Sequence, residues 1–475
     1  MNKSACCLLA GALLAGSGAV GTARAETLED VLATAYNSNP TLMARRAQLR
    51  ATDEGVPEAL SGWRPTVTLQ GSVARVDSFN NLNSLNDLGG GTSSRAAGGT
   101  QDNIWNTPKA YGGTLTQQLY NGGQTVAATR QAEASVLSTR AQLDSTEEQV
   151  LLQAATAFLN VVRDQATVKL SINNEQVLRR QLEATQERFR VGEITRTDVS
   201  QAEARLAQAT ADRIGAEGAL QNSRAAFIDV VGRPPESPQA PSEPTALPGS
   251  FDEVKTIALA HNPNVVAADW TAKAAEAGVD VVRGKLLPSV SASLGVTRTV
   301  DSQFYDNDSH STQAMLNLSV PLYQSGSVWA QLRAQKQTYG QRLIEADQSR
   351  RDALQSANQA WETLRAARAR VKSYSAQIAA NQLALTGVEE EAKVGARTVL
   401  DTLNAEQELF TSRVNLVTAQ HDEMVAAFQL DAALGRMTAE GLHLPVDIYD
   451  PRKHYDDVRD QWIGGGIDKA PGHDE

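Results

Sequence analysis

The chain has 475 residues, with 44 Lys and Arg against 55 Asp and Glu, and a formal net charge of −11. Such an acidic balance argues against nucleic acid or an anionic membrane surface as a partner. The only cysteines are Cys6 and Cys7, so disulfides, cysteine metal sites and thiol catalysis are excluded from the rest of the chain.

Residues 1–25 have the pattern of a secretory signal. A single Lys is followed by an apolar stretch, and small residues stand at Ala23 and Ala25. We therefore expect cleavage before Glu26 and export from the cytoplasm. Both cysteines lie too early in this segment for lipid attachment. Removing its two basic residues leaves 42 (44 − 2) against 55 acidic ones, a net charge of −13 (42 − 55).

A duplication runs through the remaining chain. Asn39-Pro40 returns as Asn262-Pro263 at a shift of 223 (263 − 40), and Val191-Gly192 returns as Val394-Gly395 at a shift of 203 (395 − 192). The difference of 20 (223 − 203) predicts one loop insertion between about residues 74 and 110 of the first copy. The sequence thus contains one supersecondary unit twice.

Two proline-free stretches predict very long helices. They run from about Gly123 to Arg190 and from about Gly326 to Lys393, and are rich in Gln, Ala, Glu, Arg and Leu. At 1.5 Å per residue each helix would be roughly 100 Å long. A heptad stripe typical of a coiled coil runs along the second one: Leu364, Val371, Ile378 and Leu385.

Shorter helices flank the long ones. We expect them at about 40–60 and 263–286, and again from Thr197 to Gly232 and from Thr398 to Gly435, where glycine suits a helix end. Their summed lengths predict that two short helices stack end to end beside each long one. On periodicity alone, a solid antiparallel bundle is the simpler interpretation.

The last of these helices has an apolar stripe with alternating steps of four and three: Leu403, Gln407, Phe410, Val414, Val417, His421, Met424 and Phe428. The matching stripe of the first copy is made of small residues that allow close helix approach: Ala204, Ala207, Ala211 and Ile214. His421 lies on the stripe, so we expect a core or interface histidine rather than a ligand.

Each copy also contains a predicted β-hairpin, at about 64–122 and 287–324. Apolar and small polar residues alternate, as in Val67, Leu69, Gly71 and Val73. Strands of about ten residues with one polar face fit a membrane barrel with a wet interior, and half of a water-soluble sandwich is the alternative. Aromatic residues near the strand ends suggest interfacial anchors: Trp63, Trp105, Tyr111, Tyr120, Phe304, Tyr305 and Tyr323.

Four strands cannot close a membrane barrel, since the smallest have about eight. After residue 25 no run of about 18 apolar residues occurs, so a closed barrel is the expected way to span a membrane. Oligomerisation is then obligatory. Two, three or four copies would supply about 8, 12 or 16 strands, and an open lumen favours the larger numbers.

No catalytic motif is present: phosphate loop, dinucleotide fingerprint, zinc helix and nucleophile elbow are all absent from the sequence. The 6 histidines are scattered singly. Carboxylates stand among Arg and Lys on long helices, as expected for a solvated face. We predict no enzyme, no cofactor and no metal site.

One polar motif is repeated, at the turns 191–198 and 394–401. Both contain Thr-x-x-Asp, in Thr195 with Asp198 and in Thr398 with Asp401. A capping box after a helix-ending glycine explains this spacing. It does not explain why the same turn occurs twice, at one end of two equal helical hairpins.

At these residues the chain resembles the TolC family of outer-membrane efflux and secretion channels. The likeness rests on the tandem repeat, the tip motif Val-Gly-x-x-Thr-x-x-Asp followed by Asn404-Ala405, and the strand-to-helix passages 119–123 and 321–326. It implies a mainly α fold with a β-barrel part, in which long antiparallel coiled coils of a homotrimer form a periplasmic tunnel below a 12-stranded barrel in outer-membrane lipid.

The resemblance also implies partners and site residues. A periplasmic adaptor would dock at the tips, at Val191, Gly192, Val394 and Gly395, and an inner-membrane transporter of ABC, RND or MFS type would complete the complex. In the family two aspartates form acidic rings at the entrance, and this chain has Asp401 and Asn404 there. Arg397, Thr197 and Asp198 match residues that latch the entrance, whereas Ala392 replaces a latching tyrosine.

We therefore expect a first repeat at 26–232, a Pro-rich linker at 233–250, a second repeat at 251–435 and a periplasmic tail at 436–475, partly disordered. The predicted function is an outer-membrane conduit for efflux or type I secretion, with its cargo open. A secreted coiled-coil structural or adhesive protein is the alternative. A periplasmic hydrolase and a metal-efflux channel are further alternatives.

Overall fold

The computed structural model describes residues 26–79, 103–236, 238–239, 241, 248–301 and 308–466. The predicted signal segment 1–25 and the aromatic residues Phe304 and Tyr305 lie outside this part. Within it, no helix is at once long and apolar enough to cross a lipid bilayer.

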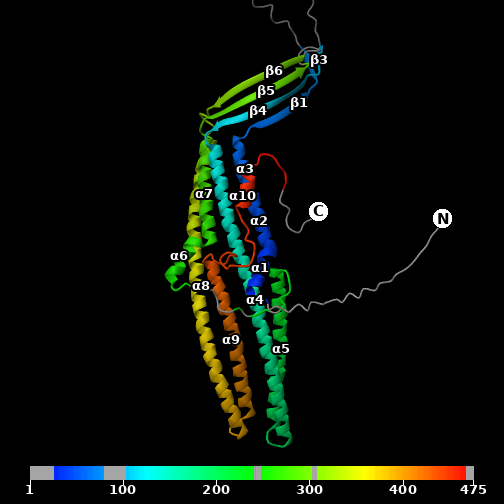
Figure 1. The fold of residues 1–475 in the computed structure, drawn as a ribbon, viewed down its shortest axis with the longest axis vertical. Coiled ribbons are helices and arrows are strands. Elements are labelled where there is room, and N and C mark those ends of the chain that lie inside the picture. The colour runs from blue at the N-terminus through cyan, green and yellow to red at the C-terminus, as the bar shows by residue number, and fades with distance from the viewer. Residues whose placement is uncertain are drawn as a thin grey trace, which may run out of the picture.

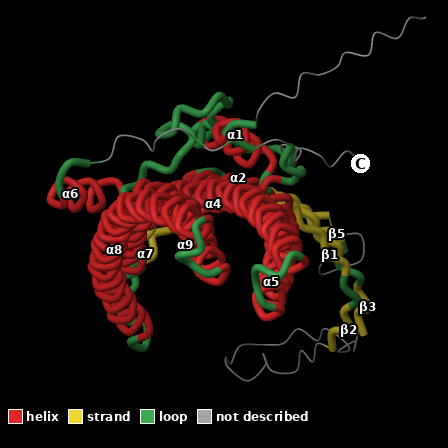
Figure 2. The backbone as a smooth tube through the Cα atoms, turned by 90° about the horizontal axis from the view of Figure 1, so that it is seen from below, coloured by secondary structure: helices red, strands yellow, loops and turns green. Residues whose placement is uncertain are grey.

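Two long helical hairpins dominate the molecule (Figure 1). Helices α4 (Gln124–Arg190) and α8 (Ser327–Lys393) have 67 residues each. They turn back into α5 (Arg196–Val231) and α9 (Val399–Ala433), so that two tips lie at one end and the strands at the other. Seen along its length the helical layer is a curved wall (Figure 2).

Glycines fix where the long helices begin and end. Gly123 and Gly326 precede them at φ values of 77° and 76°, and Gly192 and Gly395 follow them at 82° and 78°. These left-handed conformations suit glycine because a Cβ would be strained there. The same punctuation in both copies explains why both helices have the same length.

The expected end-to-end stacking is found, and one asparagine builds it in each copy. Asn39 lies between α1 (Leu28–Ser38) and α2 (Pro40–Asp53); its side chain accepts from the Thr41 amide at 2.9 Å and donates to the Val230 carbonyl of α5 at 3.1 Å. It therefore caps one helix and holds the end of another.

Asn262 repeats this arrangement between α6 (Phe251–His261) and α7 (Pro263–Gly284). Its side chain accepts from the Asn264 amide at 3.0 Å and donates to the Ala433 carbonyl of α9 at 3.3 Å. Each Asn-Pro pair is thus the joint at which an upper and a lower helix meet beside a long one.

The main core surrounds α4. Phe158 and Leu151 are fully buried there against α1 and α2, together with Tyr36 and Phe227. Helix α8 buries mostly alanines, and its smaller core is formed with α6 and α9 around Leu430 and other residues. The two long helices therefore have the same length, but α4 is more deeply buried than α8.

The two short-helix stripes also differ. In α9 the stripe packs towards α4, and Phe428 joins the core that contains Phe158. In α5 the equivalent residues are exposed, Ile214 by 57%, and the helix instead buries Ala202 and Ala209. The prediction that the alanine stripe lies in a helix contact is therefore wrong within one chain.

Four strands form an antiparallel sheet in the order β1-β4-β5-β6: β1 (Thr66–Val73), β4 (Lys109–Asn121), β5 (Ser289–Val300) and β6 (Asp308–Ser319). The register aligns Val67, Leu115, Leu294 and Ala314 in one cross-strand row and Thr66, Thr116, Ser293 and Met315 in the next. Because opposed residues point to the same side, one face is apolar and the other largely polar.

A second ribbon departs from the sequence prediction. Strands β2 (Val76–Phe79) and β3 (Asn103–Asn106) pair within the stretch that we expected to be loop. They were missed because four residues are too few to establish a period-two pattern.

The chain after α9 packs along the outside of α1, α2 and α4. Met437 and Ala439 are buried, and the Ala439 amide donates to Glu147 at 2.7 Å. Beyond the short helix α10 (Lys453–Val458) this segment rises beside α3 (Gly55–Leu60) and the 3-10 turn η1 (Ser61–Trp63) towards the sheet (Figure 1). Residues 467–475 lie outside the described part.

Candidate functional site

Each of the two tips carries a complete capping box. At the first tip, the Asp198 amide donates to Thr195 Oγ1 at 3.4 Å, and the Thr195 amide donates to Asp198 Oδ2 at 3.0 Å. At the second, Thr398 and Asp401 make the same pair of bonds at 3.2 and 3.0 Å. The capping interpretation of Thr-x-x-Asp is confirmed, and both aspartates commit Oδ2 to their own helix start.

Asp401 is an anion at neutral pH. Hydrogen bonds from the Thr398 amide and hydroxyl lower its pKa below the usual range, and the positive charge of Arg397 adds to this. A fixed negative charge therefore lies partly exposed at the second tip.

Arg397 pairs within its own tip. Its Nε donates to Glu391 at 2.8 Å across the turn, much as Arg188 pairs with Glu193 at 3.0 Å in the first tip. Among the described residues no hydrogen bond joins Arg397 to Thr197 or Asp198. The predicted latch is not a contact within one chain, and a role between chains stays a proposal.

Asn404 joins the two hairpins. Its Oδ1 accepts from Arg205 Nη2 of α5 at 2.9 Å, next to a small cluster in which Leu178 and Ala202 pack with Val399 and Leu403. Arg205 was missed because the repeat gives no signal for it: the equivalent residue of the second copy is Glu408 (205 + 203).

The tips expose apolar side chains. Val191 and Val394 are 72% and 81% exposed. A Cβ on Gly192 or Gly395 would meet open space, so these glycines are required by their positive φ and not by crowding. Each tip is thus a small apolar knob beside a turn that glycine forms.

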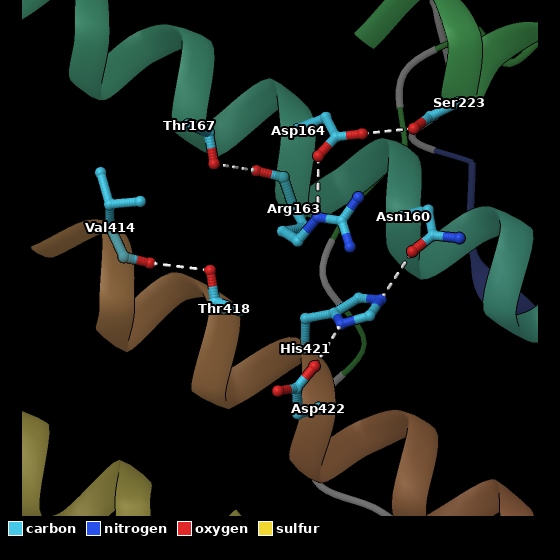
Figure 3. A network of polar contacts seen from close by, with 9 residues as sticks. All are labelled: Asn160, Arg163, Asp164, Thr167, Ser223, Val414, Thr418, His421 and Asp422. Carbon is cyan, nitrogen blue, oxygen red and sulfur yellow. Dashed lines mark hydrogen bonds and ion pairs between the residues drawn. The ribbon is translucent and has the colours of Figure 1, made fainter. Parts of the chain in front are cut away.

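A polar network crosses the wall above the tips (Figure 3). His421 Nε2 lies 2.8 Å from Asn160 Oδ1 and its Nδ1 lies 3.0 Å from Asp422, while Asp164 binds Arg163 at 2.7 Å and accepts from the Ser223 hydroxyl. Burial lowers the pKa of His421, which favours a neutral imidazole. As expected for a core or interface histidine, His421 lies partly buried at the contact between α9 and α4.

Buried acids were not foreseen. Glu148 of α4 is 6% exposed, and burial, with repulsion from Asp144 and Glu147, raises its pKa to about 9. Burial raises the pKa of Asp431 to about 6. No group of three or more potential metal ligands gathers in the described ranges.

Comparison with known proteins identifies the family. The model of the outer membrane efflux protein family matches residues 31–233 and 256–436, which are the two repeats. The chain belongs to this family. The chain is 34% identical over 462 residues to the outer membrane efflux protein BepC of Brucella suis, covering 97% of this chain and 96% of BepC.

One further relative and one solved structure are similar to the chain. The outer membrane protein TolC of Escherichia coli is 23% identical over 442 residues, covering 90% of this chain and 85% of TolC. The crystal structure of the Campylobacter jejuni CmeC outer membrane channel superimposes with a TM-score of 0.75 at 14% identity, covering 91% of this chain and 89% of CmeC.

Family membership confirms the resemblance seen in the sequence. The expected fold class is also confirmed: mainly α, with long antiparallel coiled-coil helices, an antiparallel sheet and a tandem repeat. The family consists of outer-membrane channel proteins, so this chain is one, with its helical hairpins in the periplasm.

Proposed function

We propose that three copies of this chain close around one axis into a conduit for efflux or type I secretion. The observation that carries the proposal is that equivalent surfaces of the two repeats are buried to different extents within one chain. In α9, Val414 and Val417 are half-buried in the helix wall, whereas the equivalent Ala211 and Ile214 of α5 (shift 203, 417 − 214) are exposed.

A second copy of the chain offers a surface that would bury the exposed stripe of α5. Within the chain, α9 of the second repeat packs against α4 of the first. By the same geometry, α5 of one copy would pack against α8 of the next, the long helix that has little cover of its own. Such head-to-tail contacts join unlike surfaces and form rings when the rotation closes.

The sheet supports the same closure. β4 and β5, which come from different repeats, pair in the middle, while β1 and β6 are left as edges with unpaired backbone groups. An exposed edge is a template for another strand. If β6 of one copy pairs with β1 of the next, three copies give one closed sheet of twelve strands (4 × 3).

The two faces of the sheet then have separate roles. The apolar face includes Leu69, 87% exposed, and Leu316, 69% exposed; in the proposed assembly it contacts outer-membrane lipid. The opposite face, with Thr68, Thr114 and Gln313, lines a wet lumen.

The tips form the periplasmic entrance in this proposal. Three copies bring three Asp401 carboxylates into one ring, which attracts cations. Asn404 in place of a second acidic residue makes the ring weaker. Arg397 with Thr197 and Asp198 would latch neighbouring copies in the closed state. Opening then requires Arg397 to leave these partners and to pair with Glu391 of its own tip.

An adaptor that binds the open arrangement more tightly would shift the population towards it. The apolar knobs at Val191 with Gly192 and at Val394 with Gly395 are its proposed contacts. The conduit itself performs no chemistry, and the energy comes from an inner-membrane transporter of ABC, RND or MFS type.

Single-channel conductance of the reconstituted protein tests the function. We expect small conductance at rest and larger conductance in Arg397→Ala combined with Asp198→Ala; unchanged conductance would reject the latch. Asp401→Asn should reduce the preference for cations, with Glu193→Gln at the first tip as the matched control. Absence of any channel in the membrane would reject the conduit.

A further inference from the structure

The last described part of the tail is fixed at the base of the sheet. Arg64, which follows η1 and lies two residues before β1, donates from Nη1 to the Gln461 carbonyl at 2.7 Å. Its guanidinium lies over the Trp462 ring, 5.0 Å from the ring centre. Residues 461 and 462 of the tail are thus held where the helices meet the strands.

The path to this point is fixed as well. The Tyr449 amide donates to the Tyr36 hydroxyl at 3.0 Å, His454 Nδ1 lies 3.2 Å from Asp53, and Arg459 pairs with Glu133 of α4 at 3.8 Å. These contacts climb α1, α2 and α4 in turn. The position of Trp462 is therefore set by a strap along the helices and not by a freely moving end.

At this end the tail presents apolar side chains to solvent. Trp462 is 65% exposed and Ile463 is 92% exposed. A monomer in water gains nothing from exposing a tryptophan and an isoleucine side by side.

Other large apolar residues are exposed at the same level, where helices join strands: Trp63, Tyr120, Leu287, Leu322 and Tyr323. Trp63 immediately precedes Arg64, and Tyr323, the equivalent of Tyr120 in the second repeat (323 − 203), is 80% exposed. Tryptophan and tyrosine favour the boundary between lipid tails and headgroups, because an apolar ring and a polar tip are satisfied there together.

We propose that Trp462 and Ile463 are a membrane anchor that inserts into the periplasm-facing interface of the bilayer around the sheet. Arg64 holds the indole from one side and, as a long basic side chain, reaches lipid phosphates. The tail thereby straps the helical wall to the membrane at the foot of β1. The proposal rests on the proposed function only in that lipid surrounds the sheet.

Spin labels on single cysteines test this anchor. No cysteine occurs after Cys7, so Ile463→Cys, Ile448→Cys and Leu316→Cys each give one labelling site in the mature protein. Ile448 is 56% exposed in the tail below the anchor and is the aqueous control; Leu316 on the apolar face of β6 is the lipid control. The readout is relaxation by oxygen against a water-soluble nickel chelate, in proteoliposomes.

We expect the label at 463 to be relaxed preferentially by oxygen, at a shallower depth than the label at 316, and the label at 448 to be relaxed by nickel. A 463 label that behaves like 448, or that is shielded from both reagents by a neighbouring copy, would overturn the anchor. If the label at 316 also reports water, the proposed function fails and not the anchor alone.

Trp462→Ala in the Ile463→Cys background sharpens the test. The label should move at least severalfold towards nickel accessibility, whereas Trp462→Tyr, which keeps an interfacial ring, should leave it in place. An unchanged depth in Trp462→Ala would contradict the role of the indole.

Discussion

The two long helices have the same length and the same punctuation, yet they are packed in different ways. Helix α4 is enclosed by α1, α2, α9 and the tail, and it buries Phe158 and Leu151. Helix α8 buries mostly alanines, and Ile344 and Leu383 are exposed. Duplication has therefore preserved the backbone, while the side chains differ: α4 is covered within its own chain, and α8 is left with little cover.

Equivalent positions of α4 and α8 show this divergence most clearly. Glu147 and Glu148 of α4 become Arg350 and Arg351 in α8 at the shift of 203 (351 − 148). In the first copy Glu147 holds the Ala439 amide of the tail. In the second, Arg350 pairs at the surface with Asp269 and Asp347, both at less than 3 Å (2.6 and 2.7 Å).

The largest expected effect is in the core around α4. Phe158→Ala removes a fully buried ring from the core of α4 and should destabilise the protein by about 3–5 kcal/mol. Thermal unfolding followed by circular dichroism measures this change. Ile448→Ala, at an exposed tail position, is the control and should change stability by less than about 0.5 kcal/mol. Equal effects would mean that the core is not where we place it.

The next effect is in the surface that needs a neighbour. Ile214→Asp puts a charge on the exposed stripe of α5, where a second copy would bury it at a cost of about 2 kcal/mol or more per contact. We expect single chains in detergent with unchanged far-ultraviolet circular dichroism. Glu217→Asp, which keeps a charge on the same helix, should remain assembled. A fully assembled Ile214→Asp protein would show that the stripe faces solvent.

The buried acid Glu148 predicts a pH dependence that its equivalent position in α8, Arg351, cannot supply. The pKa of Glu148 is raised from 4.5 to about 9, so the folded state holds a proton that the unfolded state loses, and stability falls as pH rises from about 4.5 to 9. Glu148→Gln should be more stable at pH 8 by about 1–2 kcal/mol and less dependent on pH. Arg351→Gln is the matched control in α8; if both variants gave the same profile, Glu148 would not be the source.

The smallest effect is expected where the two copies are alike. Thr195→Ala and Thr398→Ala each remove one capping box and should cost about 1 kcal/mol, seen as faster hydrogen exchange in the first turn of α5 or α9. Thr197→Ala, two residues after Thr195 and outside the capping box, is the control. A loss at one tip only would show that the second tip is supported by other contacts, such as the Arg397–Glu391 pair.

Much of this architecture can be predicted from sequence because it depends on local signals. Glycines that require positive φ, Thr-x-x-Asp caps and period-two strands each specify their own backbone, and duplication shows them twice. The Asn-Pro joints were visible only as repeats, since their bonds to Val230 and Ala433 link distant parts of the chain. Arg205 with Asn404, Arg64 with Trp462 and the burial of Glu148 have no local signature at all.

The central claim is that one chain is incomplete and that three close a shared wall. The native mass of the protein, extracted from outer membranes in a mild detergent, tests it most directly. We predict a particle of three copies that precipitates when the detergent is removed. Monodisperse single chains, or a protein that stays dissolved without detergent, would contradict the account.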